Sequence, residues 1–136
     1  MTLSTHISFR SASEPIARPR VPGQNLTASK SYCVQRFSGD IDMQTIADLA
    51  AALDRVLGRK PDCVVLDLSR VHFLSASGLA ILSQFGSDAA DQAIPVAVVA
   101  KREVARPIEA CGLVGVLPIY ASVEEAGSDL TESRSH

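Results

Sequence analysis

Apolar residues follow two spacings along this chain, and each spacing predicts one kind of element. Continuous runs of β-favouring residues are typical of short strands buried on both faces, whereas weak alternation is typical of an edge strand. Between the runs, apolar residues recur every three or four positions, which indicates amphipathic helices. The predicted strands are 63–68 and 94–99, with 32–37 stopping at Gly39, a weaker strand at 116–120 and a candidate edge strand at 5–9.

The predicted helices have recognisable ends. Residues 46–57 form the first, with Asp42 as its N-cap. A second begins near Ala76 or Ser77, directly after the strand at 63–68. Two further helices are expected at 103–111, closed by Gly112 with Pro107 fitting only the first turn, and from Ser122, whose spacing to Glu125 makes a capping box.

Strands that alternate with helices predict an α/β domain. We expect a single domain over 31–127, with a central mixed, largely parallel sheet of four to five strands and about four helices. Residues 1–30 contain Pro15, Pro19 and Pro22 and predict a flexible N-terminal tail apart from the candidate edge strand. Residues 128–136 predict a disordered C-terminal tail.

Composition narrows the classes of function. The chain has 136 residues, a formal net charge of −2 and 4% aromatic residues, so neither counterion release nor base stacking favours nucleic acid as a partner. No apolar run approaches the roughly 20 residues that span a bilayer, and no secretory signal precedes the domain, which predicts a cytoplasmic protein without a membrane segment. Nucleotide loops, nucleophile motifs and metal-ligand spacings are absent from the sequence, so we expect no catalytic residues, no metal and no cofactor, and hence no enzyme.

Three stretches, in order, resemble the STAS domain family of bacterial anti-sigma-factor antagonists: 37–42, 64–69 continuing into 73–79, and 108–113. The resemblance covers 32–126 and implies the α/β fold expected above. It also implies a protein that binds an anti-sigma factor, usually a serine kinase-like protein with a histidine-kinase-like ATP fold, and so frees a sigma factor for transcription. Similar STAS domains serve as accessory subunits of membrane lipid-transport ATPases, which is the alternative function.

The family's partner surface and phosphorylation switch fall on one segment. The resemblance places its aspartate on Ser75, its phosphoacceptor serine on Ala76, and its second Ser/Thr on Ser77. Alanine has no hydroxyl, so three outcomes stay open: a permanently active antagonist, phosphorylation moved to Ser77 or Ser75, or control by other means. Either serine is equally suited to capping a helix. The predicted partner-binding residues are Asp40, Asp42, Leu74, Ser75, Ala76, Ser77, Gly78 and Leu79.

The three cysteines lie in apolar surroundings and have no CxxC spacing, which is typical of small core residues. Cys111 ends a helix and Cys63 begins a strand. Because a crossover helix normally runs antiparallel to its strands, both are expected at the same pole of the domain. We therefore hypothesise that Cys63 and Cys111 form a redox-sensitive pair.

Overall fold

The structure, a computed structural model, describes residues 3–11 and 31–133. Its five-stranded sheet has the order β1-β2-β3-β4-β5, with β1 antiparallel to β2 and the other neighbours parallel. The predicted mixed, largely parallel sheet is therefore confirmed. The elements are β1 Ser4–Ser11, β2 Ser31–Ile41, α1 Ile46–Gly58, β3 Val64–Leu74, α2 Ala76–Asp91, β4 Val96–Ala100, α3 Arg102–Ala110, a 3-10 turn Leu113–Gly115, β5 Ile119–Tyr120 and α4 Val123–Ser133.

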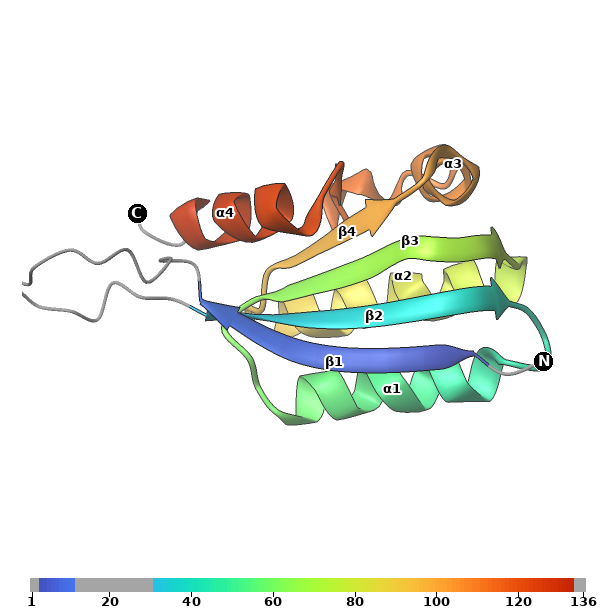
Figure 1. The fold of residues 1–136 in the computed structure, drawn as a ribbon, viewed down its shortest axis with the longest axis horizontal. Coiled ribbons are helices and arrows are strands. Elements are labelled where there is room, and N and C mark those ends of the chain that lie inside the picture. Colours follow the sequence, from blue (N-terminus) through green and yellow to red (C-terminus); the bar gives the residue numbers. More distant parts are fainter. Residues whose placement is uncertain (1–2, 12–30, 134–136) are drawn as a thin grey trace, which may run out of the picture.

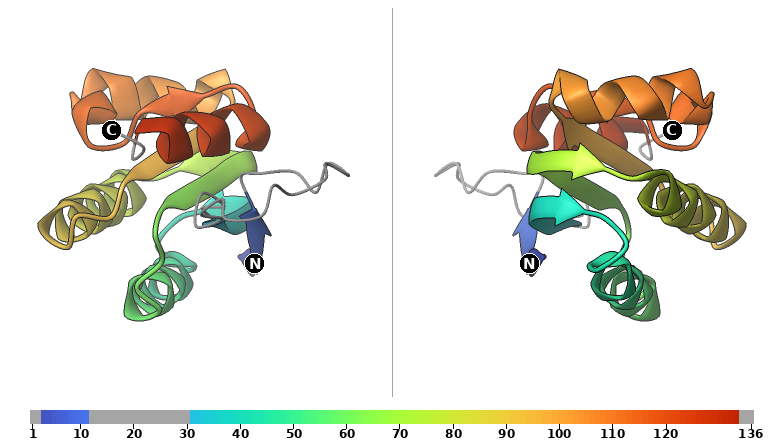
Figure 2. Two further views of the ribbon diagram at one scale, coloured as in Figure 1. Left: turned by 90° about the vertical axis from the view of Figure 1, so that its left-hand side faces the viewer. Right: turned by 90° about the vertical axis from the view of Figure 1, so that its right-hand side faces the viewer.

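The helices are divided between the two faces of the sheet. Helices α1 and α2 cover one face, and α4 lies over the other (Figures 1 and 2). Helix α3 is seen end-on in Figure 1 and lengthwise in Figure 2, so it crosses the carboxyl-end side of the strands instead of running back along them. The helices thus leave the carboxyl ends of β2 and β3 accessible.

Two buried clusters hold these layers together. The larger joins α1, α2 and α3 to one sheet face, and it includes the buried α1 residues Leu49, Leu53 and Val56 at the predicted helical spacing. The smaller lies between α4 and the other face. In that cluster α4 comes very close to the sheet, because a Cβ on Gly127 would lie 2.2 Å from the Tyr32 ring. The members of the smaller cluster are Tyr32, Val34, Cys63, Val65, Ala97, Val99, Val123, Ala126 and Leu130.

Both central strands continue past the points where their sequence patterns end. The strand β2 does not stop at Gly39 but bulges there, with a φ of 105°, and continues to Ile41. Strand β3 continues from Leu68 to Leu74. Polar residues interrupt the apolar ones in these extensions, where one sheet face is uncovered. The continuous apolar runs therefore underestimated both strands.

Helix ends also differ in detail from the prediction. Helix α4 continues to Ser133, beyond the expected domain end at 127, because Leu130 and Thr131 are buried. Pro107 lies past the first turn of α3, and Gly112 follows that helix with a φ of 73° as expected for a left-handed cap. The edge strand is longer than expected, and the rest of the predicted N-terminal tail, 12–30, lies outside the described residues, as does 134–136.

Candidate functional site

The carboxyl ends of β2 and β3 lie side by side; β3 leads directly into α2, and β2 leads through a short turn into α1. Asp40 pairs with Phe73 and Ile41 with Leu74 along the parallel register. The Ser75 N–H then donates a hydrogen bond of 2.8 Å to the Ile41 carbonyl, which fixes the turn into the helix. Parallel α/β sheets commonly place binding sites at this edge. Segments from both strands and the first turn of α2 consequently share one surface.

Ser75 is the N-cap of α2. Its backbone is extended, with φ −73° and ψ 165°, and its Oγ accepts a hydrogen bond of 3.1 Å from the Gly78 N–H. The cap satisfies one of the four amide groups that a helix start leaves unpaired. The capping interpretation is therefore confirmed for Ser75, and its hydroxyl oxygen is already occupied by the fold.

Gly78 lets α2 approach the strand ends closely. A Cβ at this position would lie 2.5 Å from Ile41 Cγ2 and 2.9 Å from Leu74 Cδ1, both shorter than real Cβ contacts. Gly78 and Leu74 are buried. Both were predicted to contact a partner, and in the structure they support the site from beneath.

Asp42 has a different role from the one predicted. Helix α1 begins at Ile46, so Asp42 is not its N-cap. Instead, Asp42 Oδ1 accepts hydrogen bonds from the Gln44 N–H at 3.0 Å and the Thr45 N–H at 3.2 Å, which closes a turn ahead of the helix. Buried Thr45 completes the turn, because its Oγ1 donates to the Asp40 carbonyl at 2.8 Å and accepts from the Asp42 N–H at 2.9 Å. The turn presents Met43 to solvent.

Apolar side chains are unusually exposed around this helix start. Met43 is 75% exposed and Phe73 is 53% exposed. Ser77 links Met43 to the helix, because its exposed hydroxyl has a weak contact of 3.7 Å with the Met43 sulfur. Exposed apolar side chains with a polar rim are typical of protein-binding surfaces. We call the following residues the α2 entry surface: Asp40, Asp42, Met43, Phe73, Ala76, Ser77 and Leu79.

The predicted partner-binding residues lie in or beside this surface, but they do not include its large exposed apolar side chains. Ala76 and Ser77 are exposed, and Asp40, Asp42 and Leu79 are half-buried at its rim. Met43 was not predicted as a contact residue, because a single methionine in a turn has no periodic neighbours to mark it. Phe73 appeared in the predicted segment without a role. Side chains along a strand point alternately to its two faces, so the exposure of Phe73 depends on which face of the sheet the helices leave uncovered.

The cysteines do not share one environment. Cys33 and Cys63 are buried, as predicted, whereas Cys111 is exposed, and none of the three is part of a disulfide. Burial raises the pKa of Cys33, with the Arg59 charge acting in the opposite direction. Cys63 precedes the amino end of β3, while α3 crosses the carboxyl-end side of the strands (Figure 1). The antiparallel helix that would bring Cys111 to the pole of Cys63 is therefore missing, and the pair has no geometric support.

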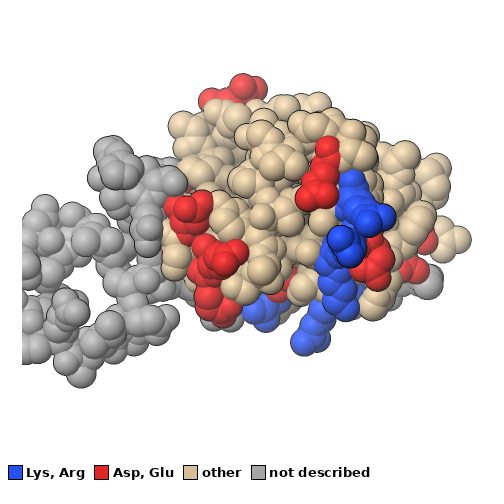
Figure 3. All heavy atoms as spheres, turned by 90° about the horizontal axis from the view of Figure 1, so that it is seen from above, with Lys and Arg blue, Asp and Glu red and all other residues tan. Residues whose placement is uncertain are grey.

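On the face that carries α3 and α4, the charged side chains lie toward its two ends (Figure 3). Acidic side chains lie toward the α4 end and basic side chains, with acidic neighbours, toward the α3 end (Figure 3). Most of the surface between them is uncharged. Among residues 3–11 and 31–133, no three His, Cys, Asp or Glu side chains gather as a metal site would require. Within the same residues, no helix is long and apolar enough to cross a bilayer.

Comparison with known proteins agrees with this geometry. The STAS domain model matches residues 24–126. The chain is 35% identical over 94 residues to the anti-sigma-F factor antagonist RsfB of Mycobacterium tuberculosis, covering 68% of this chain and 76% of that protein. A crystal structure of an anti-sigma factor antagonist from Mycobacterium paratuberculosis superposes with a TM-score of 0.66 at 29% identity, covering 95% of each chain.

A more distant structure shares the fold. The Bacillus cell fate determinant SpoIIAA, in its phosphorylated form, matches with a TM-score of 0.56 at 14% identity over 95% of this chain and 100% of that one. The match to the domain model, the 35% identity to a relative and the shared fold together confirm the predicted family. The chain belongs to the STAS domain family.

Proposed function

We propose that this chain is an anti-sigma factor antagonist, which binds an anti-sigma factor through the α2 entry surface and so releases a sigma factor for transcription. The observation that carries the proposal is the exposure of Met43 and Phe73 beside Ser77, on a family member whose 35%-identical relative is named an anti-sigma-F factor antagonist. The action is binding and requires no catalysis. None of the three proteins compared above is named as a transport subunit, so the lipid-transport alternative has no comparable support.

The chemistry of the surface defines the partner. Met43 and Phe73 supply an apolar centre, and the half-buried carboxylates of Asp40 and Asp42 lie at its rim. A partner that fits would place an apolar patch over the centre and basic side chains over the rim. The protein kinase-like anti-sigma factor implied by the family is the partner that we propose.

Ser77 is the phosphoacceptor that we propose in place of the missing hydroxyl of Ala76. Its side chain is exposed, and its only described hydrogen bond is the weak contact with the Met43 sulfur. Ser75 is a poorer candidate, because it is half-buried and its Oγ is the cap of α2. A kinase would have to break that cap to reach it.

Phosphate on Ser77 would oppose partner binding while leaving the fold intact. The start of α2 has free N–H groups and the positive end of the helix dipole, which tolerate a charge of nearly −2. At the surface, that charge would join the carboxylates of Asp40 and Asp42 beside an apolar centre. Desolvating it against a partner would be unfavourable. Phosphorylation would thus act on the interface more than on stability.

Binding is tested with purified anti-sigma factors of the same organism in a quantitative pull-down or by calorimetry. We expect Met43→Ala and Phe73→Ala each to weaken the complex about tenfold or more, as truncations at an interface centre do. Val114→Ala is the matched control, because Val114 is also an exposed apolar residue, at 44%, but lies in the turn after α3. Equal loss in all three variants, or binding to no anti-sigma factor, would contradict the proposed function.

The switch is tested separately with radiolabelled ATP and the anti-sigma factor that binds. Labelling of the wild type that disappears in Ser77→Ala, and persists in the control Ser83→Ala farther along α2, would support Ser77. Labelling that persists in Ser77→Ala would reject Ser77 as the acceptor. Binding without any labelling would leave an antagonist that has no phosphorylation switch.

A further inference from the structure

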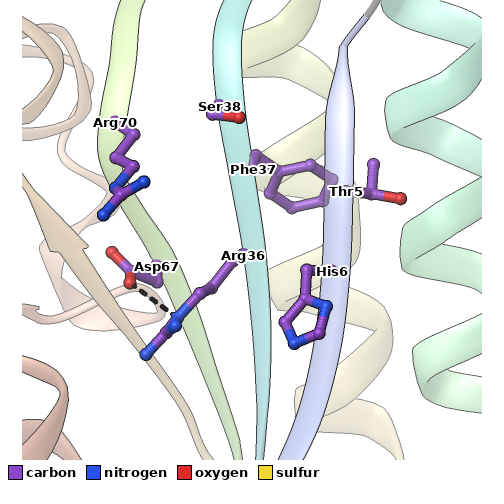
Figure 4. Close-up of a pocket in the computed structure, with 7 residues that line it drawn as sticks. All are labelled: Thr5, His6, Arg36, Phe37, Ser38, Asp67 and Arg70. Atoms are coloured by element: carbon purple, nitrogen blue, oxygen red, sulfur yellow. Dashed lines mark ion pairs between the residues drawn. The ribbon is translucent and has the colours of Figure 1, made fainter.

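A hollow lies on the sheet face opposite α1 and α2, beyond the part that α4 covers. It has a volume of about 290 Å³, and its side chains come from three adjacent strands (Figure 4). His6 pairs with Arg36, Arg36 pairs with Asp67, and Ser38 pairs with Arg70, so these side chains project from the same sheet face. The full lining is Thr5, His6, Arg36, Phe37, Ser38, Asp67 and Arg70.

The hollow has more positive than negative charge. Arg36 and Arg70 both contribute guanidinium groups, and His6 adds an imidazole. Asp67 is the only carboxylate among the described residues that line it. Since one carboxylate faces two permanently charged guanidiniums, the lining has a net positive charge, although the whole chain has a formal charge of −2. An anion is the complementary ligand.

Asp67 is occupied by the fold and by Arg36. Its Oδ1 accepts hydrogen bonds from the Ser69 N–H at 3.0 Å and the Ser69 hydroxyl at 2.6 Å. Its Oδ2 lies 3.2 Å from Arg36 Nε in an ion pair. Asp67 is buried and holds Arg36 at its Nε, which leaves the two outer nitrogens of that guanidinium outside the ion pair (Figure 4). We assign Asp67 the role of a positioning residue.

The donors in the hollow exceed its acceptors. Arg36 Nε is shielded from water, and among the described residues it has no aligned hydrogen bond despite the ion pair. The Arg70 guanidinium, on the neighbouring strand, has no hydrogen bond or ion pair with any residue that the structure describes. Two forks of N–H donors, one of them held in place, are the arrangement that binds the oxygens of phosphate.

We propose that this hollow binds a phosphate group, either as inorganic phosphate or on a small organic molecule. Arg36 and Arg70 bind its oxygens, and Ser38 and His6 contribute hydrogen-bond donors at the margin. The volume is at the lower end of small-molecule sites, which suits a phosphate with a small substituent. The site is separate from the α2 entry surface and does not depend on the function proposed for that surface.

The test is an NMR titration of the full chain with inorganic phosphate and, in parallel, with O-phosphoserine. We expect saturable shifts at the backbone amides of Arg36, Ser38 and Arg70, and an affinity that falls at least about tenfold in Arg70→Gln. The matched control is Arg106→Gln, which removes the same charge from an exposed position on α3. Tighter binding of phosphoserine would indicate an organic phosphate, and equal binding would indicate inorganic phosphate.

Three results would overturn the proposal. The first is the absence of saturable shifts with both probes. The second is an equal loss of affinity in Arg70→Gln and Arg106→Gln, which would indicate non-specific attraction to positive charge. The third is saturable binding whose shifts lie away from β2 and β3. Arg36→Gln serves as the second variant, because a folded Arg36→Gln protein with unchanged affinity would equally reject the site.

Discussion

The two serines at the start of α2 should respond differently to the same substitution. Ser75 Oγ accepts a hydrogen bond from the Gly78 N–H at 3.1 Å, whereas the Ser77 hydroxyl is exposed and, among the described residues, has only the weak 3.7 Å contact with the Met43 sulfur. Removing a serine N-cap lowers the free energy of unfolding by about 1 kcal/mol, within a range of about 0.5–2 kcal/mol. Removing an exposed serine usually changes it by less than about 0.5 kcal/mol. Ser75→Ala should therefore be measurably less stable than Ser77→Ala.

The loss can be expressed as a melting temperature. Unfolding entropy is about 2.1 cal/mol/K per residue, so a loss of about 1 kcal/mol lowers the Tm of a domain of this size by about 3–5 °C. We expect that decrease for Ser75→Ala and an unchanged Tm for Ser77→Ala, measured by thermal and urea unfolding followed by circular dichroism.

A third variant separates the cap from other effects at this position. Aspartate accepts the same N–H and favours the positive end of the helix dipole, so Ser75→Asp should retain the stability of the wild type. The resemblance to the family places aspartate here, and a shared capping role explains why serine can replace it. Equal losses in Ser75→Ala and Ser77→Ala, or a Ser75→Asp protein as unstable as Ser75→Ala, would refute this reasoning.

Three further predictions concern the rest of the domain. Gly127→Ala should lower the free energy of unfolding by about 1–3 kcal/mol in urea, because its Cβ would overlap the Tyr32 ring, whereas Gly58→Ala, with open space around it, should not. The Asp129 carboxylate accepts a hydrogen bond from the Tyr120 hydroxyl and raises the pKa of Tyr120 to about 12. This hydrogen bond stabilises the folded state below about pH 10, and the stabilisation is lost as the pH rises through about 12. Asp129→Asn should lower that pKa in a phenolate absorbance titration, and an unchanged curve would contradict the assignment. Iodoacetamide should label Cys111 in the native protein and should label Cys33 and Cys63 only after unfolding, so rapid native labelling of all three would show that the core opens.

The sequence predicted those features that depend on local chemistry. The capping box is one, because the Glu125 N–H donates to Ser122 Oγ at 3.1 Å, although the Glu125 carboxylate accepts from the Ala121 N–H instead of closing on Ser122. The start of α2 is another, since Ser75 combines a capping side chain with a following apolar periodicity. The residues that form such signals lie close together in the sequence, so these local interactions do not depend on how the helices pack on the sheet.

Features that depend on what covers a surface could not be predicted in this way. The polar residues Ser38, Ser69 and Arg70 interrupt the apolar pattern, so the pattern does not reveal where β2 and β3 end. Polar residues are tolerated there because α4 leaves that part of the sheet open. The path of α3 likewise depends on its packing against β3, which the periodicity of the helix does not reveal. We expected Cys111 to lie at the same pole as Cys63 because we assumed that α3 runs antiparallel to the strands. Since α3 crosses them instead, that expectation has no support.

The close contact of Gly78 with Ile41 and Leu74 has a consequence for the kinetics of recognition. It joins the first turn of α2 to two strands of the central sheet, so the α2 entry surface has no hinge beneath it. A surface formed in advance loses little conformational entropy on association, and rigid surfaces of this kind change little between the free and bound states. Any conformational change during binding should then occur mainly in the partner. Natural variation that strengthens or weakens the complex should accordingly appear in its lifetime more than in its rate of formation.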